Sequence, residues 1–385
     1  MCLQRKRKNH FYELNTMKHN WEYKKLKEVC QKGSSNIQQN KIAEITGNYP
    51  VYGASGFVQN IDFYHQEKPY IGIVKDGSGV GRVNIYPAQT SLLGTMQYIL
   101  PNDKVLLGYL AYCLQSLELS KFASGAAIPH IYFRDYGESF IPLPPLPIQQ
   151  KIVAELDKVC LIIEKKKQQL KELDNLAQAI FYDMFGDPVE NEKGWDTCML
   201  GDMCEIGSSK RIFAEEYTET GIPFYRGKEV SEKSKGQPTS IELYISSNRY
   251  AEIKDKYGVP KIGDILLTAV GTIGNIWVVD SDEPFYFKDG NVLWLQKKTE
   301  ASSIYLKYLL EDLIEVYKKS MANGCAYNAL TIMNLKKMPI SIIPLALQQS
   351  FATKIEAIEK QKELISRSIK EAQTLFDERM DYWFD

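Results

Sequence analysis

The 385-residue sequence lacks the features that would place it in a membrane or outside the cell. No apolar run approaches the ~20 residues that a helix needs to span a bilayer. The basic stretch Arg5–Lys8 is not followed by the apolar segment of a secretory signal. We expect residues 1–17 to form a disordered tail, with either Met1 or Met17 as the true start. The seven cysteines contain no C-x-x-C pair, and scattered thiols of this kind indicate a reducing cytoplasm.

Catalytic signatures are missing as well. The four histidines are scattered without zinc spacing, and no G-x-x-x-x-G-K-[ST] loop marks an ATPase. No segment resembles the N-P-P-Y or D-P-P-Y of an adenine methyltransferase. Gly77–Gly81 fails G-x-G-x-x-G because Arg82 follows it, so it is interpreted as a hairpin loop. Glu252 and Lys254 have nuclease-like spacing, but no Pro-Asp dipeptide occurs. We therefore predict a chain that is not an enzyme and that itself binds no cofactor or metal.

An excess of positive charge is also lacking. The chain has 47 Lys and Arg against 48 Asp and Glu, a net charge of −1. No global basic surface therefore indicates a nucleic-acid partner. If the chain binds DNA, its cations must be concentrated on one face, or a partner must supply much of the charge.

A long heptad pattern is present from Pro145 to Phe185. Its apolar positions step by four and three, with Lys166 as the polar exception, and are Ile152, Leu156, Val159, Ile163, Leu170, Leu173, Ala177, Ile180 and Met184. Such a narrow seam is typical of a coiled coil. Gly186 and Pro188 end it. A helix of this length spans about 55 Å, too long for the inside of one small domain.

The same element recurs at the C-terminus. Pro344–Gln349 repeats Pro145–Gln150 as P-L-x-x-Q-Q. A second seam follows at Phe351, Ile355, Ile358, Ile365, Ile369, Ala372, Phe376 and Trp383. Two linked copies favour intramolecular antiparallel packing over a homodimer, because the second helix can then return beside the first.

A globular unit precedes each long helix. The opening Trp21–Gly33 recurs as Trp195–Gly207, with matching Trp, Leu, acid, Cys and Gly. In the first unit we expect a hairpin of 70–74 with 82–86, a strand at 96–100 and a helix at 109–119. In the second we expect strands at 264–270, 275–279 and 291–295, and a helix beginning at Tyr305. The framework recurs while the loop residues differ, which is typical of two similar sites with different specificities.

This arrangement resembles the DNA-specificity subunit of type I restriction–modification systems, from about residue 18 to 385. The residues that carry the resemblance are the two openings and the two P-L-x-x-Q-Q exits into long helices. It implies a mixed α/β fold in which two target-recognition domains are joined by two helices that form an antiparallel coiled coil. The boundaries expected are 18–144 and 187–343 for the domains, and 145–186 and 344–385 for the helices.

The resemblance also implies function and partners. Each domain would read one half of a bipartite site in double-stranded DNA, and the helices would fix the gap between the halves. Two methyltransferase (modification) subunits would dock on the helices and would carry the S-adenosylmethionine. Motor-nuclease restriction subunits would join them. Neither the target sequence nor the gap length follows from the sequence, nor does the presence of a restriction subunit.

Candidate DNA contacts are polar and basic residues in the repeated loops, since Arg suits guanine and Asn suits adenine. In the first domain they are Lys75, Ser78, Arg82, Ser124, His130 and Arg134. In the second they are Lys210, Arg211, Arg226, Lys228, Thr272, Asn275, Asn323, Tyr327 and Asn328. For each of them the alternative is an exposed loop residue without a role. For the whole chain the alternative is a protein-interaction scaffold with two duplicated modules on a coiled-coil spacer.

Overall fold

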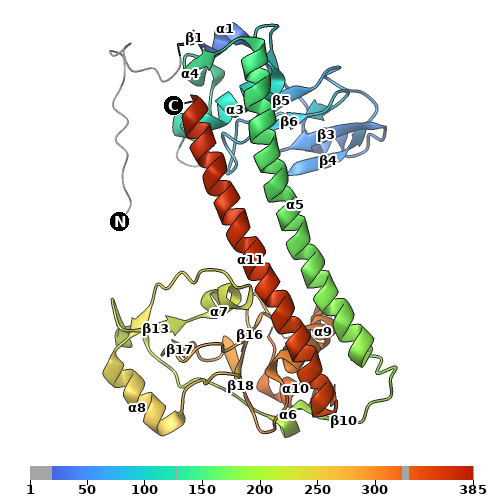
Figure 1. Cartoon of the computed structure of the whole chain (residues 1–385), viewed down its shortest axis with the longest axis vertical. Coiled ribbons are helices and arrows are strands. Elements are labelled where there is room, and N and C mark those ends of the chain that lie inside the picture. Colours follow the sequence, from blue (N-terminus) through green and yellow to red (C-terminus); the bar gives the residue numbers. More distant parts are fainter. Residues whose placement is uncertain (1–19, 126–127, 323–328, 385) are drawn as a thin grey trace. The chain divides into compact units, whose positions relative to one another are not determined.

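A computed structural model describes residues 20–125, 128–322 and 329–384 (Figure 1). The chain divides into two compact units. The first holds the residues up to Lys167 together with Arg367–Asp385, and the second holds Gln168–Ser366. The division falls within the two long helices, so each unit contains part of both. Within the described ranges, none of the helices combines the length and apolar character that crossing a bilayer requires.

The first unit is built on a four-stranded antiparallel sheet in the order β2-β8-β5-β6. Its strands are β2 (Cys30–Ser34), β5 (Tyr70–Val74), β6 (Val83–Tyr86) and β8 (Met96–Pro101). Helix α3 (Leu107–Ser116) follows β8. The predicted hairpin, strand and helix are all confirmed. The strand β5 is buried along its whole length, and it anchors the loops that extend from its end.

Smaller elements complete the first unit. A three-stranded sheet joins β3 (Tyr49–Gly53), β4 (Gly56–Ile61) and β7 (Ser91–Leu92), and β7 runs parallel to β3. The entry strand β1 (Glu22–Lys25) pairs with the exit strand β9 (Phe140–Leu143). Short helical turns are α1 (Leu26–Val29), α2 (Gln39–Ile42), η1 (Leu119–Phe122) and α4 (Phe133–Tyr136).

The second unit repeats this topology. The strands β11 (Cys204–Ser208), β18 (Val292–Lys297), β15 (Ile265–Thr268) and β16 (Ile276–Val278) form a sheet in the corresponding order β11-β18-β15-β16. The entry strand β10 (Thr197–Met199) pairs with the exit strand β19 (Pro339–Ser341). Strand β17 (Tyr286–Phe287) runs parallel to β13 (Ile222–Tyr225), as β7 does to β3. The internal repeat therefore extends from sequence to strand pairing.

The second unit differs in its additions. Strand β14 (Tyr244–Ile245) pairs with β13 as β4 does with β3, and the added strand β12 (Tyr217–Thr218) extends the smaller sheet beyond it. Its helical elements are α6 (Leu200–Met203), η2 (Ala214–Glu216), α7 (Gly227–Ser234), α8 (Ser247–Tyr257), α9 (Ser303–Ala322) and α10 (Ile332–Lys336). The sequence analysis did not anticipate α7 and α8, because they are short and mostly polar and therefore show no clear apolar period.

The two predicted long helices are α5 (Leu146–Phe185) and α11 (Leu345–Phe384), each of 40 residues. In the first unit the beginning of α5 lies beside the end of α11, where Arg379 of α11 pairs with Glu155 of α5. In the second unit the end of α5 lies beside the beginning of α11, where Lys362 of α11 pairs with Asp174 of α5 at 2.8 Å. The helices are therefore antiparallel.

The seam prediction is confirmed with one addition. Ile152, Leu156 and Ile355 are buried. Phe181 and Phe185 are buried too, although the predicted seam did not include them. Both pack against aromatic rings of α9 as well as α11. The ring centroids of Tyr305 and Phe185 are 5.0 Å apart. A heptad pattern predicts the contacts between two helices, and this third helix lies outside it.

The P-L-x-x-Q-Q motif has a structural explanation. Its first glutamine is buried in both copies, as Gln149 and Gln348. Gln149 accepts from Leu106 N at 2.9 Å and donates to the carbonyls of Lys104 and Pro144. Gln348 accepts from Ser302 N at 2.9 Å and donates to the Ile343 carbonyl. Each glutamine therefore ties the start of a long helix to the chain that enters α3 or α9.

Candidate nucleic-acid interface

In the first unit, three loops meet at the ends of the central strands. The loop between β5 and β6 is joined to the loop before α4, where Gly77 N donates to Pro129 O at 2.9 Å and Ile131 N to Lys75 O at 3.0 Å. The turn between β3 and β4 is attached by Arg82, whose guanidinium donates to Ala54 O at 3.0 Å. The described parts of these segments, 54–57, 75–82, 123–125 and 128–134, are called the first loop face.

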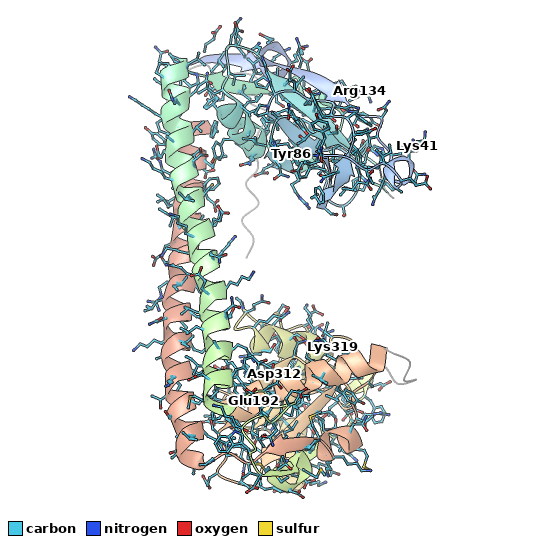
Figure 2. All side chains as sticks on the ribbon, turned by 90° about the vertical axis from the view of Figure 1, so that its right-hand side faces the viewer. Lys41, Tyr86, Arg134, Glu192, Asp312 and Lys319 are labelled. Carbon is cyan, nitrogen blue, oxygen red and sulfur yellow. The ribbon has the colours of Figure 1, made fainter. Side chains whose placement is uncertain are left out.

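The structure brings together most of the predicted contacts on this face. Ser78, Arg82, Ser124 and Arg134 are exposed. The remaining two, Lys75 and His130, are half-buried on the joined loops. The backbones of Ser124 and His130 exchange two hydrogen bonds of 2.9 Å. Arg134 lies on α4 with its guanidinium 4.7 Å from the Tyr132 ring (Figure 2).

The second unit repeats the same backbone contacts at its hairpin. Gly81 N donates to Val74 O in the first unit, and Gly274 N donates to Thr268 O in the second, at 2.8 and 2.9 Å. Both glycines have a positive φ, which the hairpin loop requires and which other residues adopt with strain. The segments 209–212, 226–228 and 270–275 are called the second loop face.

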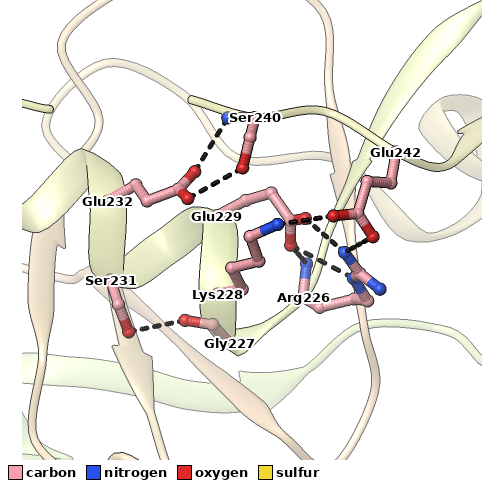
Figure 3. Close-up of polar contacts among 8 residues, drawn as sticks. All are labelled: Arg226, Gly227, Lys228, Glu229, Ser231, Glu232, Ser240 and Glu242. Atoms are coloured by element: carbon pink, nitrogen blue, oxygen red, sulfur yellow. Dashed lines mark hydrogen bonds and ion pairs between the residues drawn. The ribbon is translucent and has the colours of Figure 1, made fainter. Parts of the chain in front are cut away.

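In this second face, Arg226 and Lys228 belong to an ion-pair cluster at the start of α7 (Figure 3). The guanidinium of Arg226 contacts the fully buried carboxylate of Glu229 at 2.7 Å and that of Glu242 at 2.8 Å. Lys228 contacts Glu242 at 2.5 Å. The hydrogen bonds that Arg226 donates to Glu229 and Glu242 raise the pKa of Arg226, and hydrogen bonds from Lys228 and Arg226 lower the pKa of Glu242 to about 2. The positive charge of this pair is therefore largely neutralised.

The other candidates of the second unit have varied surroundings. Asn275 donates to Ser231 Oγ at 3.0 Å and to Thr272 O at 2.9 Å, so its amide holds α7 against the hairpin. Lys210 lies 5.3 Å from the Tyr257 ring. Thr272 is exposed at the tip of the loop. Arg211 is exposed, and its Nε donates to Asp289 Oδ2 at 2.7 Å. The remaining three, Asn323, Tyr327 and Asn328, lie outside the described residues.

Among the described residues, a groove lies beside the loop face of each unit. The first groove, of about 800 Å³, lies between residues 35–39, the β3–β4 turn and Leu93–Thr95. The second, of about 580 Å³, lies between Arg226–Lys228, Val270–Thr272 and Asn291. Thr95 O accepts from Lys75 N and Asn291 O accepts from Ala269 N, so the two grooves share a corner of the repeated framework. The sequence analysis missed the 35–40 segment, whose only signal is a cluster of amide residues.

In the part of the chain that the structure describes, no group of three or more His, Cys, Asp or Glu is placed to hold a metal ion. Glu252 lies on α8, where its carboxylate accepts from Arg249 at 3.1 Å. Lys254 is exposed on the same helix, and the ion pair of Glu252 is with Arg249.

The two units repeat one α/β framework, and each contains part of both long helices and one of two homologous loop faces. This arrangement defines a scaffold with two recognition sites. The sequence model of the type I restriction modification DNA specificity domain matches residues 18–175 and 192–374. The chain therefore belongs to the family of type I restriction–modification DNA specificity proteins.

Relatives and solved structures agree with this assignment. A putative type I restriction enzyme specificity subunit of Haemophilus influenzae is 27% identical over 371 residues, 94% of each chain. A type I restriction enzyme specificity subunit of Methanocaldococcus jannaschii is 25% identical over 380 residues, 86% of each chain. The S subunit of a type I restriction–modification system from M. genitalium has a TM-score of 0.58 at 16% identity and covers 97% of this chain and 98% of its own. This last likeness concerns the fold.

Proposed function

We propose that this chain is the non-catalytic specificity subunit of a type I restriction–modification complex and that each unit reads one half of a bipartite site in double-stranded DNA. The observation that carries the proposal is the pair of loop faces, which share backbone contacts and differ in exposed side chains. Reading by loops on a fixed framework separates positioning from specificity. The antiparallel helices then set the number of base pairs between the half-sites.

Chemistry in this proposal belongs to the partners. A modification subunit would bind S-adenosylmethionine and would methylate adenine after flipping it into its own pocket, since a base inside a duplex is out of reach. Motor-nuclease subunits would complete a restriction enzyme. Such a complex acts on cellular DNA, and a cytoplasmic location follows.

Two modification subunits would dock at matched places on the long helices. Leu176 of α5 and Leu375 of α11 occupy equivalent positions of the repeat, and they are 48% and 47% exposed. Exposed apolar side chains at repeated positions suit a partner that binds twice. Leu176→Ser and Leu375→Ser should each reduce the modification subunits bound per chain from two to one, measured by the mass of the complex. Two subunits retained in the double variant would exclude these positions as docking contacts.

The decisive experiment maps adenine methylation across the genome of a host that expresses the chain with its companion modification subunit. We expect a bipartite motif with a fixed gap. Replacing residues 187–343 with those of a relative should change one half only. An active companion that produces no motif would overturn the proposal.

The near-neutral net charge of −1 supports a second candidate, the protein-interaction scaffold. Salt separates the two functions. DNA affinity falls as salt rises, with a slope set by the number of phosphates contacted. A scaffold without a DNA-binding role would show no such dependence.

A further inference from the structure

The loop that follows the first strand of each four-stranded sheet is a common element of the two units. In the first unit, β2 ends at Ser34 and residues 35–40 follow it, the last two of which begin α2. In the second, β11 ends at Ser208 and residues 209–212 follow it. These segments are called the first and second post-strand loops.

The two loops are anchored in the same way. Ser35 Oγ donates to Leu92 O of β7 at 2.5 Å, and Ser209 Oγ donates to Phe287 O of β17 at 2.7 Å. Strands β7 and β17 are the parallel partners in the two smaller sheets. An isoleucine follows in each loop, and both Ile37 and Ile212 are buried. The anchors are repeated, and the residues between and beside them are not.

The exposed positions of the first post-strand loop carry amides. Asn36, Gln38, Gln39 and Asn40 are all exposed, and no hydrogen bond to their side-chain amides occurs among the residues described. Their backbone is nevertheless fixed, since Gly94 N donates to Ile37 O at 2.8 Å and Ile37 N to Ser35 Oγ at 3.2 Å. The loop borders the groove of about 800 Å³. Lys41, just after it, lies on the side of the first unit away from α5 (Figure 2).

The second post-strand loop presents a cation at the corresponding place. The side chain of Arg211 is 67% exposed, and its Nε donates to Asp289 Oδ2 at 2.7 Å. This single bond orients the guanidinium and leaves its two terminal nitrogens for a ligand. Two parallel donors of this kind match the O6 and N7 atoms of guanine, whereas an Asn or Gln amide matches N6 and N7 of adenine.

We propose that the post-strand loops read bases, with Asn36 and Gln38 of the first unit selecting an A·T pair and Arg211 of the second selecting a G·C pair. This assignment rests on the DNA-reading function proposed above. It places specificity on loops held by repeated backbone contacts, whereas Arg82 and Asn275, which the sequence favoured, hold neighbouring segments together.

The test uses the full chain in complex with its companion modification subunit and maps methylated adenines genome-wide. The double variant Asn36→Ala with Gln38→Ala should lower discrimination at one or two positions of one half-site by roughly 5- to 150-fold, the range for loss of a bidentate contact. The other half-site and the gap should stay unchanged. Arg211→Lys keeps the positive charge but loses the two parallel donors of the guanidinium. It should therefore weaken the preference for guanine at one position of the opposite half-site.

Two further variants serve as a control and as an isosteric alternative to the alanine variant. Gln31→Ala removes an exposed amide from β2 outside the groove and should leave the motif intact. Asn36→Asp with Gln38→Glu preserves shape and should shift preference from adenine toward cytosine, whose N4 group donates to a carboxylate. This isosteric pair covers the case in which the alanine variant does not fold.

The outcomes are distinct. An unchanged motif in the Asn36 and Gln38 variants overturns the assignment of the first loop, and an unchanged motif in Arg211→Lys overturns that of the second. If the Asn36 and Gln38 variant and Arg211→Lys alter the same half-site, the assignment of one loop to each half-site is contradicted as well. A variant complex that assembles but methylates nothing also counts against it, because loss of one contact predicts relaxed recognition. A wild-type complex without any motif instead overturns the proposed function itself.

Discussion

In both loop faces, the residue after the hairpin glycine holds a neighbouring segment in place, but the side chain that does so differs. In the first unit, Arg82 follows the hairpin glycine and holds the β3–β4 turn through Ala54 O. In the second, Asn275 stands at the same place of the repeat and holds α7 through Ser231 Oγ. The segment after β3 in the first unit and the segment after β13 in the second are thus both held to the hairpin. The comparison shows that a polar residue in a repeated loop can hold the framework, so its residue type alone does not identify a DNA contact.

The faces also differ in how their charges are balanced. The second face gathers Arg226 and Lys228, but the carboxylates of Glu229 and Glu242 neutralise them. In the first unit, the first post-strand loop presents neutral amides at the groove beside the first loop face. A count of cations would therefore rank the second face higher for DNA binding than its ion pairs support.

The largest expected effect tests whether the end of α5 stabilises the second unit as much as the end of α11 stabilises the first. Phe181 of α5 is fully buried among rings of α9 and α11, whereas Met380, its equivalent in α11, is half-buried in the first unit. Phe181→Ala should cost about 3–5 kcal/mol, and Met380→Ala about 2 kcal/mol or less. Urea unfolding of the full chain, followed by tryptophan fluorescence, measures both. Equal losses would show that the two units are packed alike.

The next effect concerns the two buried glutamines. Gln149 makes three hydrogen bonds to backbone groups and Gln348 makes two. Each group left unpaired costs about 1–3 kcal/mol, so Gln149→Ala should cost about 3 kcal/mol and Gln348→Ala about 2 kcal/mol. The adjacent glutamines provide matched controls, because Gln150 and Gln349 are exposed. Their alanine variants should be near neutral, and a comparable loss in them would contradict the role of the buried pair.

These glutamines illustrate what sequence reasoning could reach. The duplicated P-L-x-x-Q-Q predicted the beginnings of both long helices, and the heptad pattern predicted their pairing. The heptad period and the duplicated motif can both be recognised directly in the sequence, and both are clear in this chain. In each pair, the first glutamine is the buried one because it contacts the segment that leads into α3 or α9. No local sequence pattern predicts this contact.

The candidate site was harder to predict, for a related reason. Arg226 and Lys228 are followed by Glu242 only after the whole of α7, so their pairing depends on a loop path that sequence spacing does not give. The post-strand amides carry no motif, and their significance depends on the repeated serine and isoleucine anchors. Residue type suggested which side chains can read bases, and the fold determined which of them are free to do so.

A smaller effect tests the charge difference between the faces. Glu242→Gln removes the carboxylate that Arg226 and Lys228 share. One more effective cation should steepen the dependence of log affinity on log salt by about 0.9 for duplex DNA. The measurement is a salt titration of DNA binding by the complex. Glu138→Gln is the control, since this carboxylate bridges Lys25 and Lys27 beside β1, and the slope should not change. An unchanged slope in Glu242→Gln would mean that this cluster does not approach phosphates.

The smallest effect is the acid sensitivity of the same cluster. The pKa of Glu242 is lowered to about 2 in the folded chain by its hydrogen bonds from Lys228 and Arg226. A carboxylate with a lowered pKa stabilises the fold above its unfolded pKa of about 4.3, and this contribution is lost as pH falls toward the folded value. Hydrogen exchange of α7 should therefore rise in the wild-type chain relative to Glu242→Gln between about pH 4 and pH 2. Because Glu242 is exposed and screened by solvent, the change should stay local to α7 and leave the β5–β6 loop of the first unit unaffected. Equal responses of both loop faces would instead indicate that acid loosens the whole framework, and the difference between the faces would then not lie in this cluster.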